Sequence, residues 1–217
     1  MKLYSGPLSM FGAKAEIALR EKGITFELEM VPFEMKTLYE PKHPEVLRIN
    51  PKRQVPVLID GDLELFDSTQ IFEYLETLKC DPALWPAEPR ARARARLLEH
   101  KSDEVYFPFI IRLMSDPKAP GSHDGAALFY QEMERTIGGQ EWIAGAYSYV
   151  DITFYMAQLF GERMGAPIPA NLTGLHAWRD RMSARPAVRQ VAGAMGRYLL
   201  SIGRTLPPFM RKLGLNT

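Results

Sequence analysis

Cysteine occurs once in the sequence, at position 80, which excludes a disulfide bond within the chain and favours a reducing compartment. Neither sign of charge is in excess, because the sequence has 27 Lys and Arg residues and 26 Asp and Glu residues. A chain with net charge +1 has no broad basic field that would attract nucleic acid or an anionic membrane. We therefore expect neither a nucleic-acid partner nor a membrane partner.

Long apolar runs are absent too. VYFPFII is among the longest, and the start MKLYSGPLSMFG lacks the apolar core of a signal peptide. The four histidines show no metal-ligand spacing, so we expect no metal site, and no G-x-S-x-G, Walker or G-x-G-x-x-G motif is present. We interpret Cys80 as a small buried apolar residue and not as a nucleophile. A cytoplasmic location is expected.

Residues 1–78 alternate between strand and helix patterns. KLYS and TFELEMV read as strands, and MFGAKAEIALREKG reads as a helix. KTLYEPKHPEVLRIN is a proline-interrupted helical connection, and the last pattern, DSTQIFEYLETLK, is an amphipathic helix. Between them, Asp60-Gly61 predicts a hairpin turn between VLI and LELF. The predicted order is β-α-β-α-β-β-α.

From residue 79 the pattern changes. The segment 79–87 is rich in proline and reads as a linker, and residues 88–217 read as helices and loops. The helices are expected near 88–115, 122–138, 148–164, 172–184 and 187–201, with Pro108 kinking or interrupting the first. The sequence predicts an α/β domain followed by an all-α domain.

Pro56 lies in QVPVLIDGDLELFDS, inside an otherwise good strand. Proline donates no backbone hydrogen bond, so it belongs at an edge, a strand start or a special turn. A trans Pro56 would simply begin the strand. A cis Val55-Pro56 bond would instead turn the N–H and C=O of Val55 outward, where they could pair with an extended peptide ligand.

Asp67 and Ser68 follow the hairpin directly. Asp67 with Gln70 three residues later fits a helix cap, which is one interpretation. The other is a ligand site, since a helix N-terminus attracts a carboxylate and Asp67 beside it could hold an ammonium. Such a pair would suit the zwitterionic end of an amino acid.

Ser9 follows a loop with Gly6 and Pro7 and precedes the first helix. It fits a helix cap, or a hydroxyl that hydrogen-bonds a bound thiolate. Lowering a thiol pKa by about two units requires about 2.7 kcal/mol. A helix terminus supplies about 0.3–1 kcal/mol, and a hydrogen bond to a charged group about 1.5–3 kcal/mol. Ser9 would be the larger contributor.

These places together resemble the glutathione S-transferase superfamily. The resemblance rests on LYSGPLSMFGAKAEIALREKGITFE, NPKRQVPVL, LELFDSTQIFEYLE and RPAV, and covers nearly the whole chain. EWIAGAYSYVDITF resembles its buried capping motif, with Ser148 and Asp151 as a capping box. The resemblance to the superfamily implies a thioredoxin-like glutathione-binding domain at 1–78 followed by an all-α domain at 88–217. It also implies a cytosolic homodimer like the bacterial, serine-type members.

The resemblance also implies roles for residues. Val55, before a cis Pro56, would pair with the cysteinyl backbone of glutathione, while Asp67 and Ser68 would take its γ-glutamyl end. The glycyl carboxylate would meet Arg53, Gln54 and Lys42, although Arg53 and Lys42 also fit solvated surface charges. Ser9 holds the catalytic position of the serine-type classes, with Tyr4 as an alternative. Apolar candidates for the second-substrate wall, which equally fit core packing, are Met10, Phe11, Phe33, Tyr106 and Phe109.

The expected activity is that of a glutathione transferase, in which the thiolate of glutathione attacks a hydrophobic electrophile in detoxification. Two alternatives stay open. One is a glutathione-dependent isomerase or dehalogenase of the same fold, and the other is a non-catalytic interaction module like stringent starvation proteins. The first helix departs from many relatives, because Met10 replaces a proline and Glu16 follows where basic residues are common.

Overall fold

The computed structural model describes residues 1–40, 42–79 and 81–213. Its first part has the predicted order of strands and helices, with a hairpin closing a four-stranded sheet. The elements are β1 Lys2–Ser5, α1 Met10–Glu21, β2 Glu27–Met30, α2 Pro44–Ile49, β3 Val57–Asp60, β4 Leu63–Phe66 and α3 Ser68–Leu78.

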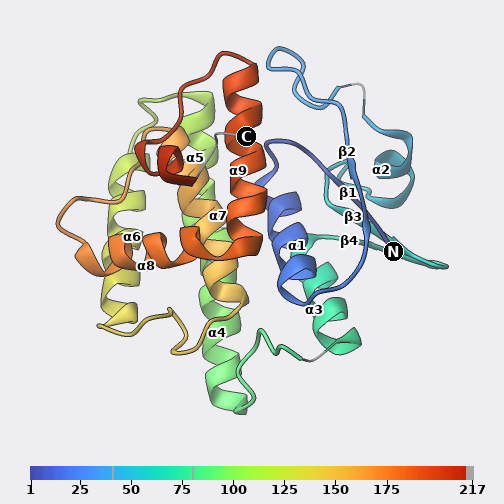
Figure 1. Ribbon diagram of the computed structural model, residues 1–217. Helices are drawn as coiled ribbons and strands as arrows, with labels where there is room; N and C mark the ends of the chain where they lie inside the picture. Colours follow the sequence, from blue (N-terminus) through green and yellow to red (C-terminus); the bar gives the residue numbers. More distant parts are fainter. Residues whose placement is uncertain (41, 80, 214–217) are drawn as a thin grey trace.

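The sheet is mixed, with strand order β2-β1-β3-β4. β1 pairs parallel with β2 and antiparallel with β3, and β3 and β4 form the hairpin whose turn contains Gly61 at φ 62°. In the register, Val57 faces Tyr4 on one side and Phe66 on the other. Figure 1 shows α1 and α3 between the sheet and the remaining helices, with α2 on the opposite side of the sheet. This is a thioredoxin-like arrangement.

The second part consists of helices (Figure 1). They are α4 Pro89–Lys101, a π-helix Ser102–Tyr106, α5 Phe107–Ser115, α6 Ser122–Ile137, α7 Tyr149–Arg163, α8 Thr173–Ala184, α9 Pro186–Ser201 and a 3-10 helix Pro208–Leu213. The fold class predicted from the sequence, α/β followed by all-α, is confirmed. None of the helices in the described part of the chain is long and apolar enough to cross a membrane.

The predicted long helix at 88–115 is interrupted, as Pro108 suggested. The interruption comes just ahead of the proline, in five residues with π-helical hydrogen bonding, and α5 then begins with Pro108 in its first turn. Proline fits there because the first N–H groups of a helix have no partner within the helix. The π-helix adds residues to the turn, so it turns the side chains after it to a different face.

The two parts are joined across α1, α3 and α7. The rings of Phe72 and Tyr149 stack with centroids 3.7 Å apart, and the hydroxyl of Tyr149 donates to the carbonyl of Ser68 over 3.1 Å. At the other end of α1, Glu21 accepts two hydrogen bonds from the guanidinium of Arg185, at 2.8 and 2.7 Å. The start of α3 is thereby supported by a helix of the second part.

The predicted capping box at the start of α7 is confirmed. Asp151 accepts hydrogen bonds from the backbone N–H of Ser148 at 2.9 Å and of Ile143 at 3.0 Å, and from Trp178 Nε1 at 2.9 Å. Asp151 is fully buried, and burial raises its pKa to about 6 while these donors oppose the rise. This carboxylate fastens a loop and α8 to α7, which is the most buried helix of the second part.

One predicted helix is much shorter than expected. Among the described residues of the segment 36–50, only Pro44–Ile49 is helical, with His43 as its N-cap. Proline can begin a helix but not continue one, which sets the start at Pro44. The interpretation of Cys80 lies outside the described residues.

Candidate functional site

Ser9 occupies the N-cap of α1. Its backbone N–H donates to the carbonyl of Gly6 at 3.0 Å, and its Oγ accepts from the N–H of Gly12 at 3.0 Å. The side chain is half-buried and faces a cavity. Because Oγ uses a lone pair for the cap, its hydroxyl proton stays free to donate to a ligand. Both interpretations of Ser9 are therefore compatible in one geometry.

The loop before β3 carries Val55, whose bond to Pro56 is cis. Within the described chain, Val55 takes part in no backbone hydrogen bond outside regular strands, and β3 begins only at Val57. Asn50 fastens this loop: its Nδ2 donates to the carbonyl of Gln54 at 2.5 Å and its Oδ1 accepts from the N–H of Lys52 at 2.9 Å. The backbone of Val55 thus stands beside the cavity in a loop held from behind.

Asp67 is the N-cap of α3 and adopts φ 74°, a conformation that few residues other than glycine tolerate. Its Oδ1 accepts from the N–H groups of Thr69 at 3.0 Å and of Gln70 at 3.3 Å, and Oδ2 makes no hydrogen bond within the described chain. Ser68 is buried, with 3% exposure, and its carbonyl is held by Tyr149. The cap therefore leaves one oxygen of a carboxylate for a ligand.

A cavity of about 270 Å³ lies over the start of α3. Its carboxylates are those of Asp67, Glu99, Asp103 and Glu104. The remaining lining includes Lys52 and His100 as the only basic side chains among its described residues. Since acidic groups outnumber basic ones here, the cavity favours a ligand group that carries positive charge.

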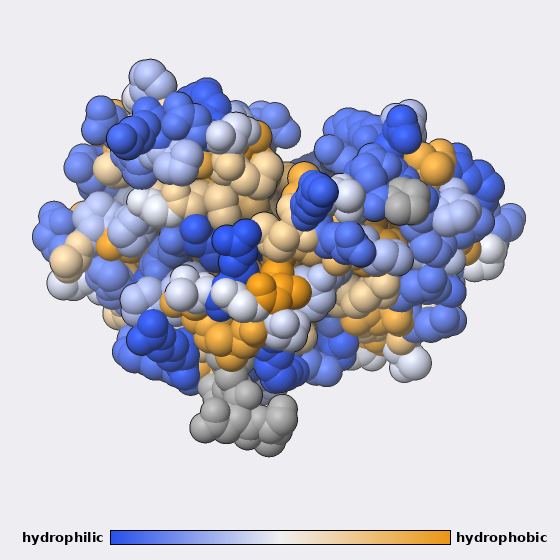
Figure 2. All heavy atoms as spheres, turned by 90° about the horizontal axis from the view of Figure 1, so that it is seen from above, coloured by the Kyte–Doolittle hydropathy of each residue, from blue (hydrophilic) through white to orange (hydrophobic). Residues whose placement is uncertain are grey.

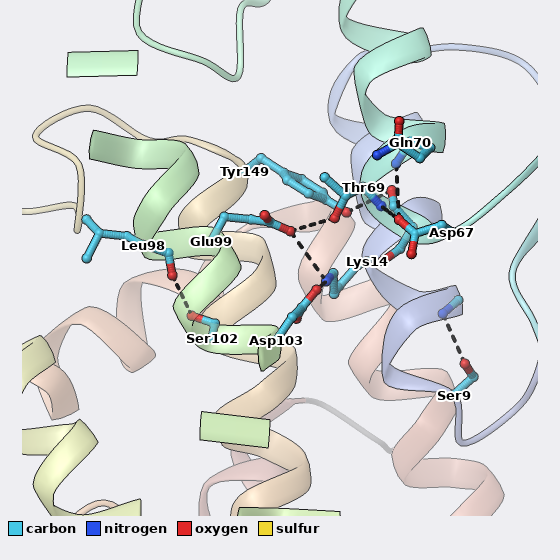
Figure 3. A network of polar contacts seen from close by, with 12 residues as sticks. Ser9, Lys14, Asp67, Thr69, Gln70, Leu98, Glu99, Ser102, Asp103 and Tyr149 are labelled. Carbon is cyan, nitrogen blue, oxygen red and sulfur yellow. Dashed lines mark hydrogen bonds and ion pairs between the residues drawn. The ribbon is translucent and has the colours of Figure 1, made fainter. Parts of the chain in front are cut away.

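Behind this cavity lies a buried ion cluster, drawn in Figure 3. The ammonium of Lys14, fully buried in α1, lies 2.5 Å from Oδ2 of Asp103 and 3.8 Å from Oε1 of Glu99. Glu99 also accepts from Thr69 Oγ1 at 2.7 Å. Burial raises the pKa of Glu99 and of Asp103, and the charge of Lys14 lowers both in part. Oδ1 of Asp103 is buried without a partner in the described chain.

A second cavity, of about 550 Å³, begins on the other side of Val55, and its wall combines apolar side chains with a few cations. Figure 2 shows the molecule hollowed between its two parts, with apolar surface along the hollow. Its cations are Lys42, Arg53 and Arg163, and no carboxylate lines it in the described chain. Phe11, Gln54 and Val55 line both cavities, so they form one cleft with opposite charge preferences at its two ends.

Comparison with known proteins now decides the family. The family model described as "Glutathione S-transferase, N-terminal domain" matches residues 8–78. The chain belongs to the glutathione S-transferase superfamily. Over 212 residues it is 28% identical to Glutathione S-transferase 3 of Zea mays, and the alignment covers 90% of this chain and 94% of that protein.

Other relatives in the superfamily carry a different name. Over 109 residues the chain is 37% identical to the stringent starvation protein A homolog of Coxiella burnetii, covering 49% of this chain and 48% of that protein. The chain thus spans about half the length of this relative. A solved glutathione transferase family member from Pseudomonas fluorescens, crystallised with two glutathione bound, aligns with TM-score 0.73 at 24% identity over 88% of this chain and 91% of that one.

Most positions that the superfamily resemblance indicates lie around the cleft. Asp67, Ser68 and Pro56 line the smaller cavity, while Ser9, Lys42 and Arg53 line the larger one. Lys42 also pairs with Glu40 at 3.4 Å. Tyr4, the alternative to Ser9, is buried in the sheet against His43 and lines neither cavity.

The apolar wall differs from the one predicted. Met10, Phe11 and Phe33 line the larger cavity as expected. Tyr106 does not: it is fully buried in the second part, and its hydroxyl meets that of Tyr130 at 2.5 Å. Phe109 points toward Gly125 of α6 and is likewise outside the lining.

Several lining residues were missed by the sequence reasoning. Phe107, Ile111 and Met114 supply the wall from α5, and Phe160, Arg163 and Met164 supply it from the end of α7. The spacing of Phe107, Ile111 and Met114 is one helical stripe, a signal that the sequence contains. Asn50, Lys14 and Asp103 gave no local signal, because their partners are distant in the sequence or are backbone groups.

Proposed function

We propose that the protein is a glutathione transferase, which activates the thiol of glutathione for attack on a hydrophobic electrophile. One observation carries the proposal. The cleft has acidic groups at one end, cations at the other, and the backbone of Val55 with the hydroxyl of Ser9 between them. Glutathione has the matching order of groups, with an ammonium and a carboxylate at its γ-glutamyl end, a thiol in the middle and a carboxylate at its glycyl end.

In this proposal the γ-glutamyl end lies over the start of α3. Oδ2 of Asp67 accepts from the ammonium, and the N-terminal turn of α3 with Ser68 receives the carboxylate. The N–H and C=O of Val55 pair with the cysteinyl backbone, as an added strand would. The glycyl carboxylate then points toward Lys42, Arg53 and Gln54. Glutathione bound to the similar Pseudomonas fluorescens structure supports this choice of ligand.

The chemistry requires a thiolate at neutral pH. Ser9 keeps its hydroxyl proton for the sulfur while its Oγ caps α1, so it supplies a hydrogen bond of about 1.5–3 kcal/mol to the charged form. The helix terminus adds about 0.3–1 kcal/mol. The thiolate forms a carbon–sulfur bond with the electrophile and displaces its leaving group, or adds to a double bond that then takes a proton from water. Ser9 forms no covalent bond.

An ultraviolet difference titration with glutathione at neutral pH tests the proposal first. We expect a saturable thiolate band, followed by turnover of a generic aryl halide. Saturable binding without a thiolate band would leave Ser9 without its proposed role. Absence of both saturable binding and the thiolate band would overturn the proposal as a whole.

Two other functions use the same fold. Isomerisation or dehalogenation would use the same thiolate, and product analysis separates it from conjugation. A non-catalytic interaction module is favoured by the 37% identity to a stringent starvation protein A homolog. That function predicts no thiolate band and no turnover, whereas the proposed function predicts both.

A cytoplasmic homodimer with a role in detoxification completes the proposal. Leu97 of α4 and Val105 of the π-helix are 54% and 47% exposed, and a subunit contact over this segment would cover them. Light scattering on the protein as it elutes from a size-exclusion column measures the mass of the assembly directly. A homodimer requires twice the chain mass of 24.7 kDa, and a single chain mass at micromolar concentration would contradict it.

A further inference from the structure

Arg163 is the last residue of α7 and lines the larger cavity together with Phe160 and Met164. Its Nη1 is buried and has no hydrogen-bond partner in the described chain. Neighbouring arginines of the same part are paired: Arg179 with Glu162 and Arg185 with Glu21. Arg163 is therefore a half-buried charge at a cavity wall that holds no carboxylate among its described residues.

Two ordinary roles explain part of this placement. A cation at the C-terminus of a helix is stabilised by the helix dipole, and the guanidinium carbon lies 4.9 Å from the ring centre of Phe160. Neither role engages the buried Nη1. Burial lowers the pKa of Arg163 to about 10, which reflects the cost of leaving this charge without an acidic partner.

Tyr39 supplies a second donor in the same wall. Its hydroxyl oxygen accepts from the N–H of Leu8 at 3.3 Å, so its proton stays free to donate. Burial raises the pKa of Tyr39 to about 12, and the charge of Arg163 acts on it in the opposite sense. The residue after Leu8 is Ser9, which places this pair of donors on the cavity that Ser9 faces.

We propose that the larger cavity binds an apolar molecule that carries a carboxylate, with the carboxylate on the guanidinium of Arg163 and the Tyr39 hydroxyl and the apolar body against Phe107, Phe160 and Met164. The inference rests on the proposed function in that it takes this ligand as the second substrate. Lys42 and Arg53 are assigned there to the glycyl carboxylate of glutathione, which leaves Arg163 for another anion. The substrate class is thus an apolar carboxylic acid with an electrophilic carbon, such as an α,β-unsaturated acid, to which the thiolate adds.

Calorimetric titration with cinnamate and with its neutral amide, cinnamamide, tests the assignment in the absence of glutathione. Hydrogen bonds to a charged group are strong enough that we expect cinnamate to bind about tenfold more tightly than the amide. Arg163→Met should weaken cinnamate by about tenfold and leave cinnamamide within about twofold. Tyr39→Phe should weaken cinnamate alone, by a smaller factor.

Arg189→Met is the matched control, because it removes the same charge from an exposed site that lines none of the described cavities. Should Arg163→Met not fold, as judged by circular dichroism, Arg163→Gln carries the test with a polar side chain. Equal binding of the two ligands by the wild type, or an unchanged preference in the Arg163 variants, would overturn the inference.

The thiolate titration on the same samples separates the two proposals. If the protein does not bind glutathione but prefers cinnamate in a way that depends on Arg163, the transferase function is wrong and the anion site stands. A thiolate band without any preference for cinnamate would do the reverse.

Discussion

Lys14 and Asp103 form an ion pair of 2.5 Å between α1 and the π-helix, although the side chain of Lys14 is wholly shielded from solvent. Glu99 lies 3.8 Å from the same ammonium. Both carboxylates line the smaller cavity, and Thr69 of the α3 N-terminus donates to Glu99. The pair therefore links the two parts of the molecule at the floor of the candidate site.

Lys14→Met should lower the free energy of unfolding by about 3–5 kcal/mol, because it leaves buried carboxylates without their cation. Urea denaturation at pH 7 measures the loss. Lys2→Met is the control, since Lys2 pairs with Glu27 and Glu29 at the surface and its loss should change little.

The cost of Lys14→Met should also depend on pH. Burial raises the pKa of Glu99 and Asp103, so the folded state binds protons more tightly than the unfolded state and stability falls as pH rises. Without Lys14 this slope steepens, and the variant should lose less stability at pH 5 than at pH 8. An equal loss at both values would show that the two carboxylates are not the cause.

Ser9→Ala should reduce turnover roughly tenfold to a hundredfold, the value of one hydrogen bond to a charged group, while glutathione binding stays within about threefold. Ser9→Thr keeps both the cap and the hydroxyl and should retain most activity. The steady-state rate and the thiolate band are measured on both. Wild-type turnover by Ser9→Ala would remove Ser9 from the mechanism.

Asp67→Asn should weaken glutathione binding by about tenfold, because it removes the charge that faces the ammonium. Asparagine keeps the acceptor for the N–H groups of Thr69 and Gln70 and tolerates the positive φ, so the cap survives. The control is a ligand: a glutathione analogue without the α-amino group should bind the variant and the wild type equally. A parallel loss for both ligands would indicate damage to the cap.

Asp151→Asn should destabilise the protein by about 2–4 kcal/mol, because the amide group places a donor against donors such as Trp178 Nε1. The penalty should shrink as pH rises. Burial raises the pKa of Asp151 to about 6, so stability from this group is present near pH 4 and is lost as pH rises through 6. Unfolding free energies across that range, with exposed Asp62→Asn as control, check the slope. A penalty that grows with pH would mean that the donors hold the pKa low.

Local patterns allowed the strands, the hairpin and the helix caps to be predicted from the sequence. Asp60-Gly61 predicted the turn, and Ser9, Asp67 and Ser148 each precede a helix as their side-chain chemistry favours. The family motifs then indicated a cleft between the two parts. These motifs place short polar residues at the start of a helix, where they fit both a capping role and a ligand-binding role. The geometry shows that one side chain can have both roles.

Two residues predicted for the apolar wall, Tyr106 and Phe109, do not line the cavity. The expected continuous helix through 88–115 is interrupted by the π-helix, which adds a residue to the turn and rotates the next helix by about 100°. Phe107, Ile111 and Met114 of this next helix line the cavity. Asp103 of this π-helix pairs with Lys14, which is distant in the sequence, and no local pattern contains such a contact.

The hydroxyl of Tyr149 that holds the carbonyl of Ser68 has a consequence for chimeras. The family model matches residues 8–78, and residues of that segment supply every direct contact to glutathione in the proposed function. Yet the start of α3 is supported by Tyr149, and Lys14 by Asp103 and Glu99, all from the second part. A first domain transplanted onto the helices of a relative would therefore bring its ligand contacts without the side chains that support them. Tyr149, Asp103 and Glu99 should be transferred together with it.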